Sequence, residues 1–196
     1  MGDTVDNLWV KPGNHLELGH FYGSIEQVDS WVIVERGAIF DAPQLTRIGS
    51  ALIYEGGQFR VPQLVSIGDL GVIGAKITLP KLARVRGRLD VDRGAVVDAP
   101  VLARVARLVV SDGTVFVPAL SAPGEYLRVG EGAVLVGPRG VRGQPGDTWS
   151  NLWRRVGLAS VTSPHGRCDR SAHCVEHALN STVLSCKRRG RFSKES

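Results

Sequence analysis

Apolar residues recur in a fixed phrase between Val32 and Pro138, with polar residues at many of the positions between them. The consensus reads Leu-x-Val-x-x-Gly-x-x-Φ-x-Φ-Pro, where Φ is apolar, and most copies continue with x-Leu-x-x-Ile/Val. The copy at 89–105 follows this consensus throughout. The glycines of the six copies lie 18 to 20 residues apart, at Gly37, Gly56, Gly74, Gly94, Gly113 and Gly132. A nearly constant period of this length indicates a solenoid of stacked coils.

Each part of the phrase predicts one side of a coil. Leu and Val at alternate positions predict a short strand with both side chains facing inward. The glycine then supplies a turn in which a positive φ is easily adopted. The next apolar pair, such as Phe59 and Val61, faces inward again, and proline ends that segment because it has no N–H to donate. Leucines on an irregular third side are expected to stack as a ladder, formed by Leu45, Leu64, Leu82, Leu102 and Leu120.

We therefore predict an all-β, right-handed solenoid of six to seven coils of 19 residues, with a parallel sheet running along its axis. Residues 1–30 are expected to form an N-terminal cap and a degenerate first coil, because 8–13 match only the opening half of the phrase. The repeat solenoid covers 31–138. Residues 139–158 are predicted to hold a linker and a short helix with Asp147 and Thr148 at its start. That helix is interpreted as a terminal cap, with a membrane-surface anchor as the alternative, and 159–196 as a loosely ordered basic tail that contains Cys and His.

The phrase Leu64-x-x-Ile67-x-x-Leu70-x-Val72, and the Pro-x-Leu that precedes the strand at 118–129, resemble the short bacterial type of leucine-rich repeat. The resemblance covers about residues 31 to 138. It implies a scaffold that binds other proteins through its strand face. At the position after the strand where the family carries Asn, this chain has Gly, so a curved horseshoe and a straighter β-solenoid both remain open.

Charge is divided unevenly along the chain, whose formal net charge is +5. Up to Pro138 there are 13 Lys and Arg against 15 Asp and Glu, whereas the remainder carries 11 against 4. The repeat body therefore has no net charge that favours nucleic acid. The basic run at 187–191 is the one stretch where contact with nucleic acid or an anionic membrane is considered, and a solvated tail is the simpler interpretation.

The residue types that carry chemistry lie mainly in the tail. The group of His165, Cys168, His173, Cys174, His177 and Cys186 meets no established zinc spacing, so we expect no metal and no cofactor. The repeats contain no catalytic constellation, and we expect a protein that is not an enzyme. No segment has the pattern of a secretory signal or a membrane span, which favours a cytoplasmic protein, with export by a non-classical route left open.

Residues between and after the strand Leu and Val are expected to point outward, and in the first coils several of them are apolar. Contiguous exposed apolar surface usually marks an interface, although cover by the chain's own terminal segments is the alternative. The predicted partner-binding face consists of Trp9, Ile33, Glu35, Leu52, Tyr54, Ile73, Asp90, Asp92, Val109 and Arg128.

The function predicted from this face is that of a non-catalytic scaffold for a protein partner or for a second copy of the chain, with no small-molecule substrate. One alternative is a structural β-solenoid that assembles end to end, as bactofilin-like solenoids do. Another is an acyltransferase of the hexapeptide-repeat type, whose coil also has about 18 residues. That enzyme class requires a sixfold apolar period and a His between coils, whereas His15 and His20, the two histidines before the tail, fall in the degenerate first coil.

Overall fold

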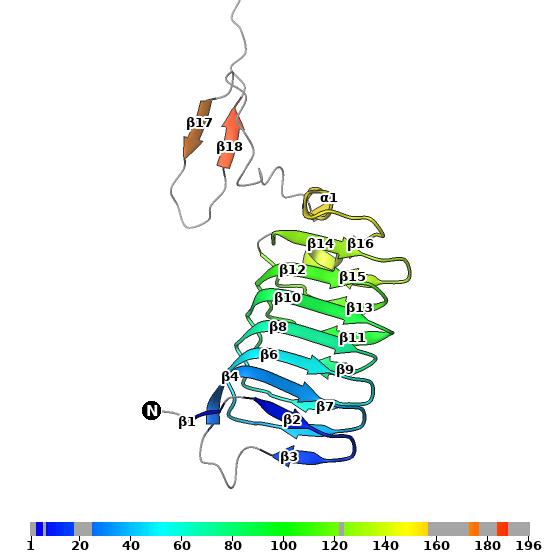
Figure 1. Cartoon of the computed structure of the whole chain (residues 1–196). Coiled ribbons are helices and arrows are strands. Elements are labelled where there is room, and N and C mark those ends of the chain that lie inside the picture. Colours follow the sequence, from blue (N-terminus) through cyan, green and yellow to red (C-terminus); the bar gives the residue numbers. More distant parts are fainter. Residues whose placement is uncertain are drawn as a thin grey trace, which may run out of the picture.

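The structure is a computed structural model that describes residues 3–5, 7–17, 25–121 and 124–156, together with the backbone of two strands at 173–176 and 184–187. The repeat region is a parallel β-solenoid of about 6 turns of roughly 19 residues, as the periodicity predicts (Figure 1). The coils stack one on the next in chain order, and short turns join the sides of each coil.

The main sheet forms the longest side of the coils. Its strands pair in parallel in the order β1-β4-β6-β8-β10-β12-β14, and β2 pairs with β4 as well. The bounds are β1 (Asp3–Val5), β2 (Leu8–Val10), β4 (Ile25–Val34), β6 (Arg47–Ile53), β8 (Ser66–Ile73), β10 (Arg84–Asp92), β12 (Arg104–Val110) and β14 (Tyr126–Val129).

A second side of the coils also consists of strands. One ladder pairs β3 (His15–Glu17), β5 (Ile39–Asp41) and β7 (Gln58–Arg60). The next comprises β9 (Lys76–Thr78), β11 (Ala95–Asp98), β13 (Gly113–Phe116) and β15 (Val134–Val136), and β16 (Arg142–Gly143) pairs antiparallel with β15. Neighbouring strands of a sheet lie about 4.8 Å apart, so the distance between consecutive coils is the same on the main-sheet side and on the second side. The stack is accordingly straight rather than horseshoe-shaped (Figure 1).

The third side is a repeated tight turn around the proline. In five of the six copies the leucine two residues after the proline donates its N–H to the carbonyl of the residue before the proline, as from Leu64 to Val61 at 3.1 Å. Proline has a fixed φ that suits the second position of such a turn. It therefore shapes the turn, in addition to ending the strand as the sequence analysis expects. The predicted ladder of five leucines is buried throughout, with at most 2% exposure. Phe40 and Phe59 stack beside it with ring centroids 5.5 Å apart.

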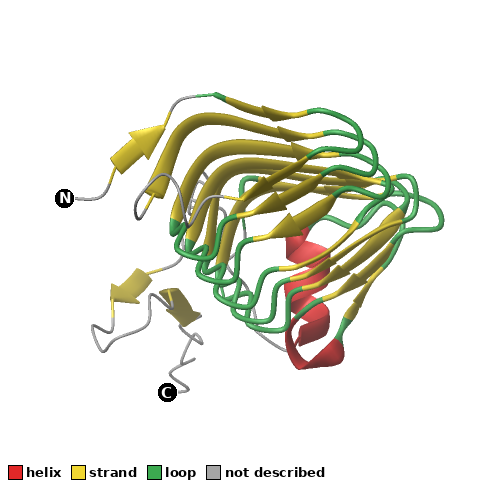
Figure 2. Cartoon of the chain, turned by 90° about the horizontal axis from the view of Figure 1, so that it is seen from below, coloured by secondary structure: helices red, strands yellow, loops and turns green. Residues whose placement is uncertain are grey.

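Glycines of two kinds lie where the chain changes direction within a coil. The turn glycines have positive φ, between 65° and 82°, except Gly113, which opens β13 and lies against the Ala95 carbonyl instead. Gly68 belongs to a second kind, inside the long main-sheet strand β8. Figure 2 shows, along the stack, that the long strands of this sheet bend. A Cβ on Gly68 would lie 2.0 Å from the carbonyl oxygen of Gly49 in the preceding coil. No side chain fits there without separating the two coils.

A helix, α1 (Trp149–Val156), follows the 3₁₀ turn η1 (Pro138–Gly140) and lies across the C-terminal end of the stack (Figures 1 and 2). Thr148 caps it, because its hydroxyl accepts the N–H of Asn151 at 3.4 Å. The side chains that α1 buries in the core are those of Trp149, Leu152, Trp153 and Val156. The helix therefore packs its apolar side against the core at this end of the stack, where the cap interpretation expects it.

Asp147 fastens the start of α1 to its last turn. Its carboxylate accepts the N–H of Gln144 at 2.6 Å and binds the guanidinium of Arg155, with Nη1 to Oδ1 at 3.1 Å. Burial raises the pKa of Asp147, but the hydrogen bonds from Arg155 and Gln144 and the charge of Arg155 together hold that pKa below its ordinary value of 3.8. The ionised form thus stabilises the cap.

In the tail, β17 (His173–Glu176) pairs antiparallel with β18 (Leu184–Lys187). The expected loose order of the tail falls mostly on residues outside the described part of the chain.

Replacing Gly68 with Ala is expected to lower the free energy of unfolding by about 2 kcal/mol or more, because the added Cβ forces adjacent coils apart. Urea unfolding of the full chain measures this. Thr78→Ala is the control, at an exposed position on β9, and should stay within about 0.5 kcal/mol of the native chain. Equal stability of the two variants would refute the close approach of coils at this corner.

Replacing Asp147 with Asn should lower the free energy of unfolding at pH 7 by about 2 kcal/mol, since charged hydrogen bonds to Arg155 are lost. A carboxyl whose pKa is depressed by folding stabilises above its unfolded value and loses that contribution as the pH falls through its folded value. The difference between native chain and variant should therefore shrink between pH 5 and about pH 3. Asp112→Asn, an exposed change, controls for general acid effects. A difference that is constant with pH would contradict this role for Asp147.

Candidate partner-binding surface

The register of the main sheet brings part of the predicted face into one continuous row. Pairing in register joins one residue from each of seven strands, one coil after the next. The row consists of Trp9, Ile33, Leu52, Gly71, Asp90, Val109 and Arg128. The outward direction expected from strand alternation agrees with the burial of the apolar residues on either side of each member, except for the partly buried Leu8 beside Trp9.

A second predicted row lies two residues further along each strand, with Glu35, Tyr54, Ile73 and Asp92. The backbone pairing of Ile73 with Asp92 continues the register. At the N-terminal end the two rows touch, because the Trp9 indole N–H donates to Glu35 Oε1 at 3.1 Å. The predicted residues therefore form one surface on neighbouring coils rather than scattered positions.

The first half of this surface is apolar and accessible to solvent. Trp9 is 64% exposed, and Trp31, a residue outside the predicted set, is 47% exposed. Four further side chains are half-buried, namely Ile33, Leu52, Tyr54 and Ile73. We call this set of six residues the apolar patch.

The structure adds a third row that the sequence analysis missed. It contains Arg88, Arg107 and Tyr126, which pair in register on β10, β12 and β14. The sequence does indicate this row, since each residue precedes the Leu of Leu-x-Val and strand alternation points its side chain outward. The row was missed because the strands were taken to begin at that Leu, whereas β10 begins five residues earlier, at Arg84.

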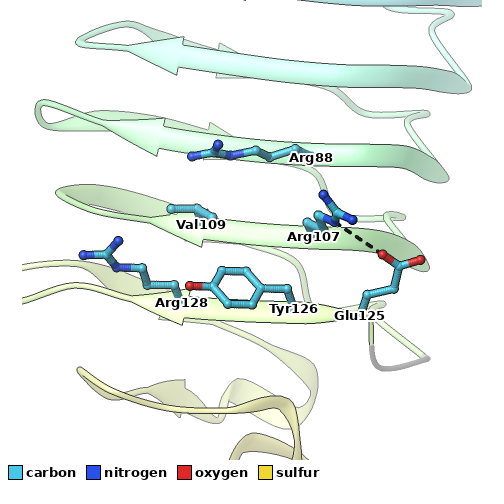
Figure 3. A pocket seen from close by; sticks show the side chains of 6 residues that line it. All are labelled: Arg88, Arg107, Val109, Glu125, Tyr126 and Arg128. Atoms are coloured by element: carbon cyan, nitrogen blue, oxygen red, sulfur yellow. Dashed lines mark hydrogen bonds and ion pairs between the residues drawn. The ribbon is translucent and has the colours of Figure 1, made fainter. Parts of the chain in front are cut away.

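The third row and the first row enclose a shallow hollow of about 500 Å³ on the outer face (Figure 3). Its lining residues are Arg88, Arg107, Val109, Glu125, Tyr126 and Arg128. Val109 is 6% exposed, so it forms part of the hollow rather than a projecting contact, and this corrects the view of it as openly exposed. Arg107 Nε lies 3.3 Å from Glu125 Oε2, as Figure 3 shows.

The two halves of the solenoid differ in net charge, and the total over the repeats conceals this difference. Residues 1–69 carry nine Asp and Glu against four Lys and Arg, whereas residues 70–138 carry six against nine. The first coils are thus net acidic and the later coils net basic. The basic half was missed in the sequence analysis because only the total up to Pro138 was compared.

Neither a group of metal-binding side chains nor a helix that could cross a membrane is found in the described part of the chain. The described residues hold no group of three His, Cys, Asp or Glu side chains placed to bind a metal ion. The tail's His and Cys side chains, including those of Cys168 and His177, lie outside what the structure describes. Among the described helices none is long and apolar enough to cross a membrane.

Comparison with known proteins returns no match: no family model, no curated protein and no solved structure is significantly similar to this chain.

Asp69 supports the bend beside this surface, because its Oδ1 accepts the N–H of Arg88 at 2.7 Å where the strand register shifts. We expect Asp69→Ala to lower the free energy of unfolding by about 1 kcal/mol, the net value of one such bond. Asp90→Ala is the matched control, since Asp90 forms only an exposed ion pair with Arg88. Chemical denaturation distinguishes them, and an Asp90 variant as unstable as the Asp69 variant would contradict the assignment.

Proposed function

We propose that this chain is a non-catalytic repeat scaffold that binds a protein partner, or a second copy of itself, through the outer face of the main sheet. The observation that carries the proposal is the apolar patch. Its residues occupy adjacent coils and leave two tryptophans largely open to water.

An exposed apolar surface of this kind is uncommon on a protein without a binding partner. Tryptophan and tyrosine are also the residues that most often dominate the binding energy of interfaces, because each contributes a large contact area. Trp9 on β2, Trp31 on β4 and Tyr54, directly after β6, supply such anchors on adjacent coils. The half-buried aliphatic side chains of Ile33, Leu52 and Ile73 add apolar surface beside them.

The solenoid suits this role because its strands hold the face in place. Each outward residue sits on a strand paired with the coil before it and, in all but the terminal coils, with the coil after it. A partner therefore meets a surface whose backbone is already ordered, so that binding requires little further loss of conformational entropy. The likeness of the phrase to leucine-rich repeats supports the same role, since proteins of that family bind others through their strand face.

The end-to-end assembly considered above receives less support. The helix α1 lies across the C-terminal end (Figure 1), and its own Trp149 and Trp153 are buried in the core. A second solenoid would have to displace this cap before its coils were able to continue the stack.

The double substitution Tyr54→Asp with Ile73→Asp tests the proposed face. Two carboxylates in the apolar patch should weaken partner capture from the native cell, or self-association measured by sedimentation, by roughly tenfold or more. Both side chains are half-buried on the outside of the sheet, so the variant is expected to fold, which circular dichroism checks.

Thr78→Asp with Thr114→Asp is the matched control, because it adds the same charge to outward positions of the second sheet. This control should bind as the native chain does. A folded Tyr54/Ile73 variant whose association is unchanged would rule out the apolar patch as the binding surface.

A further inference from the structure

Two neighbouring strands of the main sheet carry five exposed arginines. On β10 these are Arg84, Arg86 and Arg88, and on β12 they are Arg104 and Arg107. The register places Arg84 beside Arg104 and Arg88 beside Arg107. Two pairs of like charges therefore occur at directly adjacent positions of one ladder.

Such pairs are unfavourable in the free protein. Neighbouring strands are about 4.8 Å apart, and like charges at matching positions of two strands repel each other. Asp90 binds Arg88 at 2.6 Å and Glu125 binds Arg107 at 3.3 Å, which offsets one pair. The ion pairs found among the described residues include neither Arg84 nor Arg104.

The acidic partners of Arg88 and Arg107 hold them only weakly. The side chains of Arg88 and Arg107 are 52% and 62% exposed, and ion pairs in contact with water contribute little to stability. Their guanidinium groups are thus able to exchange these carboxylates for those of a partner. Arg128, on the next coil, adds a further cation beside Tyr126 and Val109 in the hollow of Figure 3.

The geometry points to a carboxylate-rich polypeptide segment as the ligand of this arginine surface, which we define as Arg84, Arg88, Arg104, Arg107 and Arg128. The inference rests on the proposed function, since it specifies the chemistry of the protein partner at the C-terminal half of the same face. A guanidinium presents a planar fork of N–H donors that matches the two oxygens of a carboxylate. A carboxylate between adjacent arginines relieves their mutual repulsion.

The distribution of acidic residues favours a polypeptide over a phosphate backbone. Asp90 and Asp92 lie on β10 with three of the arginines, Asp69 on β8 accepts the N–H of Arg88, and Glu125 pairs with Arg107. A nucleic acid strand carries a charge on every nucleotide and would bring phosphates against these carboxylates. A polypeptide can place neutral residues opposite them, and its apolar side chains can extend onto the neighbouring apolar patch.

The test uses the full chain and a fluorescein-labelled oligoglutamate, a twelve-residue peptide in which glutamate alternates with alanine, with binding measured by fluorescence anisotropy. Arg84→Gln with Arg104→Gln, and separately Arg88→Gln with Arg107→Gln, should each weaken binding roughly tenfold, because each removes one adjacent pair of charge-assisted contacts. Arg36→Gln with Arg60→Gln is the matched control, since it removes two exposed arginines from other sides of the coils. The control should bind within about twofold of the native chain. The basic run at 187–191 is the same in all four proteins, so its background contribution is constant.

Six-nucleotide oligothymidylate, of nearly the same charge, and vesicles containing phosphatidylserine serve as competing probes. Tighter binding of oligoglutamate than of either probe, lost in the two arginine variants, supports the inference. Affinity for oligoglutamate that is equal in the native chain and both variants overturns it, as does an arginine-dependent preference for oligothymidylate or vesicles. Such a failure leaves the proposed function standing, because oligoglutamate does not probe the apolar patch, whose own test uses the Tyr54 and Ile73 variant.

Discussion

Close parallel stacking of coils is the constraint on which the rest of the structure depends. The backbone groups of each strand bond to the coils on either side, so consecutive coils must stay about 4.8 Å apart on both strand-bearing sides. At Gly68 this spacing leaves no room for a side chain, because a Cβ there would lie 2.0 Å from the carbonyl oxygen of Gly49. Inward side chains must then pack on the side chains at the same position of the next coil, and the ladder position is accordingly leucine in five consecutive coils. The phrase recurs because every coil packs against its neighbours in the same way.

The same constraint leaves the outward positions free. Stacking fixes where an outward residue lies but not which residue it is, so the outer face can differ from coil to coil without disturbing the core. The first coils use this freedom for tryptophan, tyrosine and aliphatic residues, and the later coils use it for arginine. One surface thereby combines an apolar part with a cationic part, and register aligns the two along the stack. The proposed binding of a partner with apolar and acidic features follows from that combination.

The sequence predicts those features that depend on the period alone. The leucine ladder and the row from Trp9 to Arg128 follow directly from equivalent positions in successive copies, and the structure places both as expected. The bend at Gly68 was not foreseen, because a close approach between coils involves atoms 19 residues apart and has no local signal. Arg88 and Arg107 were missed because the phrase begins at the strand Leu, after the point where the strand itself begins. The choice between horseshoe and straight stack depends on the pairing of the second side, which a pattern of apolar residues does not fix.

The central claim is that the partner lies against the outer face of the main sheet and not against another side of the coils. Photo-crosslinking in the native cell tests it most directly, with p-benzoylphenylalanine placed at Leu52 in one protein and at Thr78 in another. Both positions point outward, on the main and the second sheet respectively. The account predicts a discrete crosslinked product from Leu52 and none from Thr78. Products of equal yield from both positions, or from Thr78 alone, would contradict it.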